Sequence, residues 1–435
     1  MSFQQGLSGL GAASKQLDVI GNNVANASTV GFKRARAEFS DLYAASMYGV
    51  SATATGIGSR TVAVTQQFNQ GPVTSTGNPL DLAITGQGFF RMQGADGQAM
   101  YTRNGEFQLD REGYFVNAGH YLTGYGVDDK GQVIAGPPQP LRVDTSNIGA
   151  KATTEMILGT NLDARAEPPA KAFPNVAPGS NTPDPDSYNY TNTVTAYDSL
   201  GVSHQVSFYY VRRPDAAPVP PATEGTKSLE WDVYTRVDGD AVATAAPVPP
   251  ATVGAPIAAT QLQFDSSGKV VSPAGSFLLN QAVTSGGAPL SIAVDMTGFT
   301  QNAGPYANAE QRVDGWADGV LSSVGTSKEG YVEARYSNGQ TKIVGQVVLA
   351  NFANAQGLQP IGDNRWVETY ASGGAKINAP GSSNVGYVQG AALEDSNVDM
   401  TTELVNMITA QRFYQANAQT IKTQDTVLQT LINLR

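Results

Sequence analysis

The sequence contains no cysteine and only two histidines among its 435 residues. The absence of cysteine excludes disulfides, thiolate metal sites and a cysteine nucleophile together. The two histidines, His120 and His204, fall in segments that we expect to belong to different domains, so a histidine-based catalytic triad is not predicted. The pair Gly86 and Gly88 lacks the third glycine of a nucleotide-binding loop. We therefore expect no enzymatic activity, no metal and no cofactor.

Charged residues are scarce as well. They make up 15% of the chain, against about 25% in an average soluble domain, so a partner subunit is one candidate to cover part of the surface. The net charge of −10 argues against nucleic acid as a partner, because its binding requires clustered lysine and arginine. The short basic cluster Lys33–Arg36 is therefore interpreted as an exposed turn or as an ion-pair site between subunits.

Long apolar runs are also missing. None approaches the roughly 20 residues that a membrane-spanning helix needs, so membrane insertion is not predicted. The first residues, Met1–Gly6, lack both the basic and the apolar region of a signal peptide. Such a start is compatible with a cytoplasmic protein and equally with export through a dedicated secretion channel.

Helical periodicity is present at both ends of the chain. Small or apolar residues recur in a 4–3 alternation over residues 3–24 and again over residues 400–432. This alternation is typical of the contact line, or seam, of a coiled coil. Helix-start signals precede the second pattern at Ser396 and Asp399. The predicted seam residues are Phe3, Leu7, Leu10, Leu17, Ile20, Val24, Met400, Leu404, Met407, Tyr414, Ala418, Ile421, Leu428 and Ile432.

The remaining faces of these predicted helices carry few charges. The first helix has only Lys15 and Asp18, and the last is rich in glutamine. Small residues such as Gly6 and Gly9 allow close contact on several sides without desolvation of ions. We therefore predict that both helices pack against other subunits. The alternative is a poorly soluble helix pair in an ordinary monomer.

Strand and turn patterns dominate the centre of the chain. Residues 229–237 alternate between apolar side chains, such as Trp231 and Val233, and polar ones. Turn signals of the form Asp-x-x-Gly recur, for example at Asp198–Gly201, and glycine is abundant with 47 residues. Regular turns without intervening helical periods predict antiparallel β-sandwiches or barrels.

Composition shifts divide this β region. Prolines crowd over residues 166–186, and the heptapeptide Ala-Pro-Val-Pro-Pro-Ala-Thr occurs at Ala217–Thr223 and again at Ala246–Thr252. Such stretches favour extended, solvated loops, which we assign to an outward-facing domain. The chain is predicted to run outward and to return, which brings both terminal helices to the same end.

The predicted fold is therefore mainly β with α-helical coiled-coil termini, in a discontinuous arrangement of two antiparallel β domains nested outward. The predicted segments are an N-terminal coiled-coil helix (1–30), a linker or hairpin (31–60), the first half of an inner β domain (61–146), an inserted outer β domain (147–298), the second half of the inner domain (299–390) and a C-terminal coiled-coil helix (391–435).

Several stretches carry recognisable motifs. They are Ser8–Asn26, Thr29–Lys33, Thr76–Phe90, Tyr101–Gly105 and Ser396–Asn417. Together they closely resemble the signatures of the bacterial flagellar rod and hook family, and they cover both ends and the first β segment. Within that family the length of this chain favours the hook subunit, because the rod members that share these ends are much shorter and lack a large insert.

The resemblance implies a structural protein that polymerises into a hollow, flexible helical tube, a universal joint that carries torque from rod to filament. It implies binding to further copies of the chain, to the distal rod protein and to the hook cap and hook–filament junction proteins. It also implies export to the cell exterior by the flagellar type III apparatus. Two alternatives are an unusually long rod or hook-associated subunit, and a secreted carbohydrate-binding or hydrolysing β protein with helical ends.

Overall fold

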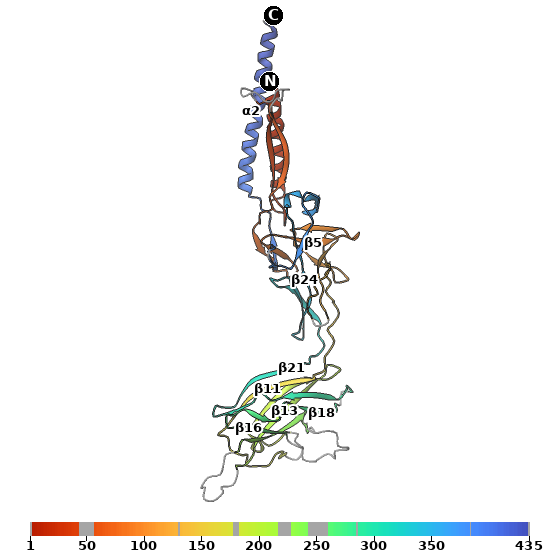
Figure 1. The fold of residues 1–435 in the computed structure, drawn as a ribbon, viewed down its shortest axis with the longest axis vertical. Helices are drawn as coiled ribbons and strands as arrows, with labels where there is room; N and C mark the ends of the chain where they lie inside the picture. Colours follow the sequence, from red (N-terminus) through yellow and green to blue (C-terminus); the bar gives the residue numbers. More distant parts are fainter. Residues whose placement is uncertain are drawn as a thin grey trace. The chain divides into compact units, whose positions relative to one another are not determined.

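The computed structural model describes residues 2–42, 56–128, 131–176, 182–215, 228–241, 260–283, 286–382 and 384–433 (Figure 1). The chain divides into two compact units. The first unit comprises Met1–Ser146 and Leu321–Arg435, and the second comprises Asn147–Val320. The second unit is thus an insertion in the sequence of the first. Both copies of the repeated heptapeptide, at Ala217–Thr223 and Ala246–Thr252, lie outside the described residues.

The first unit carries the chain ends as helices, α1 (Ser2–Ala25) and α2 (Met400–Asn433). α2 starts directly after Asp399, whose carboxylate accepts a hydrogen bond from the backbone amide three residues on at 2.7 Å and so caps the helix. The helices run antiparallel, with Gly6 near the start of α1 beside Ile421 in the second half of α2 (Figure 1). At 1.5 Å per residue, roughly the last eight residues of α2 extend past the start of α1. The prediction of a helix at each end is confirmed.

A hairpin of β1 (Ala35–Leu42) and β2 (Gly58–Gln66) packs along α1. The Asn23 side chain on α1 donates to the carbonyl of Ala35 and accepts from its amide, both at 2.9 Å. Because a two-stranded ribbon is marginally stable alone, these contacts with the helix hold it in place. Residues 43–55, in the predicted linker, lie outside the described part of the chain.

The rest of the first unit is built around one large antiparallel sheet, whose main path runs β22-β23-β24-β9-β5-β6-β27-β26. The strands of this sheet are β5 (Phe89–Gln93), β6 (Ala99–Thr102), β7 (Gln108–Leu109), β8 (Phe115–Asn117), β9 (His120–Tyr125), β10 (Gln139–Pro140), β22 (Leu321–Thr326), β23 (Tyr331–Tyr336), β24 (Thr341–Val347), β25 (Leu349–Asn351), β26 (Gln359–Gly362), β27 (Arg365–Val367) and β28 (Lys376–Asn378). The smaller pairs are β3 (Val73–Ser75) with β30 (Ala392–Glu394) and β4 (Leu82–Thr85) with β29 (Tyr387–Gly390), and Ala355–Gly357 forms a short 3-10 helix.

Aromatic side chains from both parts of the sequence form the core of this sheet. Phe89 on β5 packs edge-to-face against Trp366 on β27 and against Phe352, with ring centroids 5.6 and 5.9 Å apart. Tyr101 on β6 contacts Phe352 at 4.7 Å. Aromatic packing of this kind contributes beyond simple burial, and it joins the segment before the insertion to the segment after it.

The described part of the second unit contains two sheets around one core. Their orders are β18-β19-β11-β20, with β21 beside β11, and β12-β13-β14-β16-β17, with β15 beside β14. Met156 on β11 and Ile292 on β19 share a buried cluster with Phe208 on β13 and Trp231 on β14. The strands are β11 (Glu155–Asp163), β12 (Tyr190–Tyr197), β13 (Ser203–Arg212), β14 (Glu230–Val237), β15 (Asp240–Ala241), β16 (Thr260–Phe264), β17 (Val270–Ser272), β18 (Ser276–Gln281), β19 (Leu290–Asp295), β20 (Thr300–Asn302) and β21 (Ala307–Val313), with a 3-10 turn at Pro185–Ser187.

The pairing of β11 corrects the sequence prediction of purely antiparallel domains. β11 lies parallel to β19, with Glu155 opposite Ala293, and parallel to β20, with Asn161 opposite Thr300. Parallel neighbours require a long crossover connection, and here the whole second sheet lies in the chain between β11 and β19. The mainly β architecture itself is confirmed.

The limits of the second unit differ from the predicted outer domain at 147–298. β20 and β21 both pair with β11, so the unit continues to Val320. At its ends, Ile148 and Gly319 exchange both backbone hydrogen bonds, at 2.9 and 3.0 Å. The chain therefore enters and leaves the insertion at one place.

Candidate assembly surface

Small residues make the contact between α1 and α2. A β-carbon placed on Gly6 would lie 3.0 Å from Cγ1 of Ile421, and one placed on Gly9 would lie 2.7 Å from Oδ1 of Asn417. Ala410 on α2 is also small and fully buried. Because the glycines leave no side chain in the contact, the two helix backbones approach closely.

The large apolar side chains of α2 lie mostly outside this contact. Leu404 is 46% exposed, Ile408 52% and Phe413 57%. Large apolar side chains exposed together on one element of a soluble monomer often mark an interaction surface. These side chains form the α2 apolar surface, which comprises Met400, Leu404, Val405, Ile408, Phe413, Tyr414, Val427, Leu428 and Ile432.

The predicted seam residues differ in how far the chain itself buries them. Only Ile20 is buried within this set. Half-buried members are Leu10, Leu17, Val24, Met407, Ala418 and Ile421, and exposed members are Phe3, Leu7, Met400, Leu404, Tyr414, Leu428 and Ile432. The pairing of α1 with α2 thus leaves most of the set accessible, and the seam between subunits stays a prediction.

Sequence reasoning missed part of the α2 apolar surface. Val405, Ile408, Phe413 and Val427 fall outside the predicted 4–3 series but are as exposed as its members. A signal for them existed, because a helix with apolar residues around most of its circumference is expected to be enclosed by neighbours. A single 4–3 series follows only one face and therefore hides the others.

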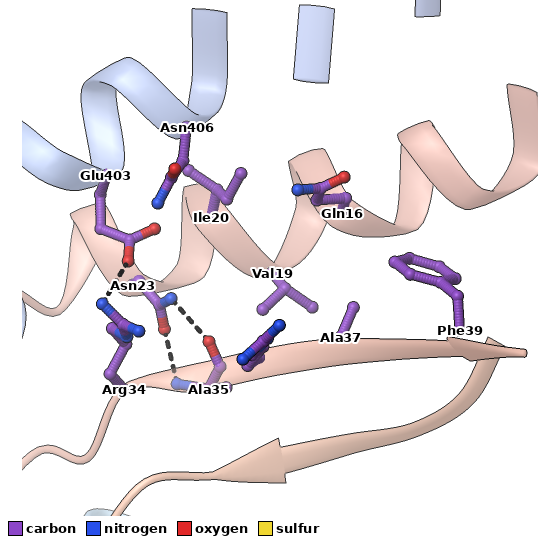
Figure 2. Close-up of a pocket in the computed structure, with 11 residues that line it drawn as sticks. Gln16, Val19, Ile20, Asn23, Arg34, Ala35, Ala37, Phe39, Glu403 and Asn406 are labelled. Carbon is purple, nitrogen blue, oxygen red and sulfur yellow. Dashed lines mark hydrogen bonds and ion pairs between the residues drawn. The ribbon is translucent and has the colours of Figure 1, made fainter. Parts of the chain in front are cut away.

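A groove of about 360 Å³ lies where α1, β1 and the start of α2 meet (Figure 2). Val19 on α1 points toward β1 near Ala37, Ile20 on α1 lies beside Asn406 on α2, and the Arg34 guanidinium lies 3.4 Å from the Glu403 carboxylate on α2. These contacts link the hairpin to both helices along the groove.

Neither a metal centre nor a membrane span is found in the described ranges. No group of three or more histidine, cysteine, aspartate or glutamate side chains there is placed to hold a metal ion. The described helices are also not apolar enough over a sufficient length to cross a membrane.

A buried ionic cluster, the Glu394 junction, ties the two chain ends to the sheet. Oε1 of Glu394 lies 2.6 Å from Nζ of Lys33, and Oε2 lies 2.7 Å from the Arg103 guanidinium. The Gly71 amide also donates to Oε1, at 2.9 Å. The side chains of Lys33 and Glu394 are fully buried, and that of Arg103 is 3% exposed.

This junction corrects the interpretation of the basic cluster Lys33–Arg36 as an exposed turn or an ion-pair site between subunits. The partner of Lys33 is Glu394 of the same chain, whereas Arg36 is exposed. Burial alone would raise the pKa of the Glu394 carboxyl, but the nearby Arg103 and Lys33 cations outweigh burial and hold this pKa below its ordinary value. Burial in turn lowers the pKa of Lys33 despite its carboxylate partner.

The two histidines lie in different units, where each has local partners. The ring of His120 contacts the Arg365 guanidinium in the first unit. The ring of His204 lies between Asp238, at 2.6 Å, and Asp198, at 3.4 Å, in the second unit. Burial alone would lower the pKa of His204, but hydrogen bonds to the two carboxylates raise it above its ordinary value.

Comparison with protein families identifies flagellar domains along the chain. The family model described as "Flagella basal body rod protein" matches residues 3–33, and the "Flagellar hook protein FlgE/F/G D1 domain" matches residues 83–151. The "Flagellar basal body protein FlaE D2 domain" matches residues 161–316, and the "Flagellar basal body rod FlgEFG protein C-terminal" model matches residues 389–434.

Whole-chain relatives agree with these domains. The chain is 40% identical to the flagellar hook protein FlgE of Salmonella typhimurium strain LT2 and 39% identical to that of Escherichia coli K12, with all of both sequences covered. It is 31% identical to the FlgE of Treponema pallidum, covering all of this chain and 99% of the relative.

A solved structure shares the fold. The crystal structure of Helicobacter pylori flagellar hook protein FlgE2 matches with a TM-score of 0.52 at 14% identity, and the match covers 74% of this chain and 100% of that one. The full-length relatives confirm the prediction of a structural hook subunit rather than an enzyme. On this evidence, the chain belongs to the flagellar hook protein family.

Proposed function

We propose that the chain polymerises through its terminal helices into a hollow, flexible helical tube that acts as a universal joint between rod and filament. The α2 apolar surface carries this proposal. Inside the chain, α2 meets α1 at Gly6 and Gly9, and the side chains of the α2 apolar surface stay exposed and available for other subunits. Covering them on assembly would supply the main driving force, since buried apolar area contributes about 25 cal/mol per Å².

The predicted seam residues take part in coiled-coil contacts between neighbouring subunits in this proposal. Contact of one surface with a different surface of the next copy generates a helical polymer when the rotation between copies does not close into a ring. The helices line the inner wall, around a channel through which exported subunits pass. The inserted segment forms the outer β domain, because both chain ends belong to the first unit.

The partners and location follow from the family resemblance. The tube would be bounded by the distal rod protein, the hook cap and the hook–filament junction proteins. Subunits would reach it outside the cell through the flagellar type III export apparatus. Small residues of α1 lie in the contact inside the chain, and the apolar residues of α2 are exposed. This arrangement supports self-association as the first of these interactions.

Electron microscopy of the concentrated full chain tests the proposal. Tubes of uniform diameter with a central channel are expected. A related hook protein, treated in the same way, serves as the control. Monodisperse particles without polymer, at concentrations where the control assembles, would contradict self-assembly and favour a β-domain binder.

A further inference from the structure

The Glu394 junction gathers segments that are far apart in the sequence. Lys33 lies eight residues after α1, Glu394 six residues before α2, and Arg103 follows β6 in the large sheet. The backbone takes part as well, because the Gly31 amide donates to the Glu394 carbonyl at 2.7 Å. The segment that follows α1 is thus bonded to Glu394, which lies in the segment before α2 and is also bonded to Arg103 beside the sheet.

Polar contacts around the cluster reinforce this arrangement. Nζ of Lys33 donates to the Asn69 carbonyl at 2.9 Å, and the Arg103 guanidinium donates to the Gly86 carbonyl at 2.8 Å. Asn397, three residues after Glu394, accepts from the Arg34 amide at 2.7 Å. The segment that leaves α1 therefore runs beside the segment that enters α2, with Glu394 at its centre.

Stability alone does not account for such a cluster. Removing ions from water is costly, and well-packed apolar residues in place of a buried ion network are often equally stabilising. A buried carboxylate with three fixed donors instead holds the segments that carry these groups in one relative position. Any displacement of one segment leaves a buried charge unpaired.

We propose that Glu394 is the positioning residue for assembly: through Lys33 and Arg103 it fixes the bases of both terminal helices on the β sheet in the one register that matches neighbouring subunits. This inference rests on the proposed function, because polymerisation through the helices would depend on the helix positions that Glu394 fixes. The segments it joins are the ones on which torque between the helices and the sheet would act.

Lys33→Met is the variant that tests this role most cleanly. It removes the ion pair between Lys33 and the Glu394 carboxylate and leaves the backbone hydrogen bond from Gly31 to Glu394 in place. The carboxylate keeps Arg103 at 2.7 Å and the Gly71 amide at 2.9 Å. Methionine fills the space of the buried lysine stem. Lys33→Arg, which keeps the charge, is the conservative control. Val324→Ala, at a buried position on β22, is a control for a general loss of stability in the first unit.

The experiment measures growth of preformed wild-type tubes from purified full-length monomers by light scattering, together with thermal unfolding followed by tryptophan fluorescence. We expect Lys33→Met to raise the monomer concentration required for growth by about tenfold or more. Its thermal midpoint should fall no further than that of Val324→Ala, which should still elongate tubes, and Lys33→Arg should regain most of the growth.

Glu394→Gln, which leaves two buried cations without an anion, should show a larger defect. Growth of Lys33→Met at the wild-type concentration would overturn the positioning role. An equal growth defect in Val324→Ala would also overturn it, because the effect would then be one of stability alone. Failure of the wild-type chain to form tubes would instead contradict the proposed function itself.

Discussion

Leu404→Asp is the substitution with the largest expected contrast between the free chain and the polymer. Leu404 is 46% exposed within the chain, so an aspartate there can reach water, and the monomer should fold normally. In the proposed tube the same position is covered by a neighbouring subunit. The variant should therefore be soluble and folded but impaired in assembly.

The magnitude follows from the burial of Leu404. Full burial of a leucine side chain contributes about 2 kcal/mol, so covering the exposed half of this one contributes about 1 kcal/mol per subunit. Burying an unpaired carboxylate in its place costs several kcal/mol more. A combined loss of about 3 to 4 kcal/mol corresponds to a rise of roughly a hundredfold or more in the concentration at which tubes form.

Sedimentation of polymer from monomer over a concentration series measures this rise, and circular dichroism follows the fold of the monomer. Leu278→Asp is the matched control, because Leu278 on β18 of the second unit is 53% exposed. It should assemble as the wild type does. Assembly of Leu404→Asp at the wild-type concentration would refute the account of the α2 apolar surface.

Gly9→Ala should weaken helix pairing and raise the assembly concentration in sedimentation, because its β-carbon would lie 2.7 Å from the side-chain oxygen of Asn417 on α2 and would displace this side chain, which donates to the Phe413 carbonyl; Gly11→Ala, with nothing within 4 Å, should not. The pKa of His204 is raised above 6.5, so protonation stabilises the second unit fully below that value, and the stabilisation is lost as pH rises through the raised pKa. Thermal unfolding should show this loss as the pH rises above 6.5, and His204→Ala should abolish it while tubes still form; an unchanged profile would contradict the role of the two carboxylates. Replacing residues 150–317 with a Gly-Ser linker should leave tube formation intact but change curvature, because the ends of the insertion lie side by side. Electron microscopy that finds wild-type curvature, or no tubes despite normal export, would contradict this expectation.

The helical ends could be predicted from the sequence because their signal is local. The 4–3 alternation over residues 400–432 and the Asp399 cap coincide with α2, although the predicted helical segment begins nine residues earlier, at 391. The partner that covers each face of a helix cannot be predicted from local sequence, because it depends on contacts with distant segments and with other subunits. Gly6 and Gly9 face α2 within the chain, whereas Leu404 stays 46% exposed, and the alternation alone cannot distinguish these cases.

Long-range contacts account for what the sequence left undetermined. The motifs that contain Lys33 and Arg103 were each recognisable, yet nothing in either indicates that both bind Glu394. The parallel pairing of β11 was missed for the same reason, since strand direction depends on partners more than a hundred residues away. Periodicity and turn chemistry therefore predict elements, whereas buried charges and sheet order emerge only from the fold.

The most direct test of helix-driven assembly compares the full chain with a fragment of residues 31–399, which lacks both helices but keeps Lys33, Arg103 and Glu394. Electron microscopy of both, at the same concentration and buffer, is the measurement. The account predicts tubes from the full chain and soluble, folded monomers from the fragment. Tubes from the fragment at the concentration that suffices for the full chain would contradict it.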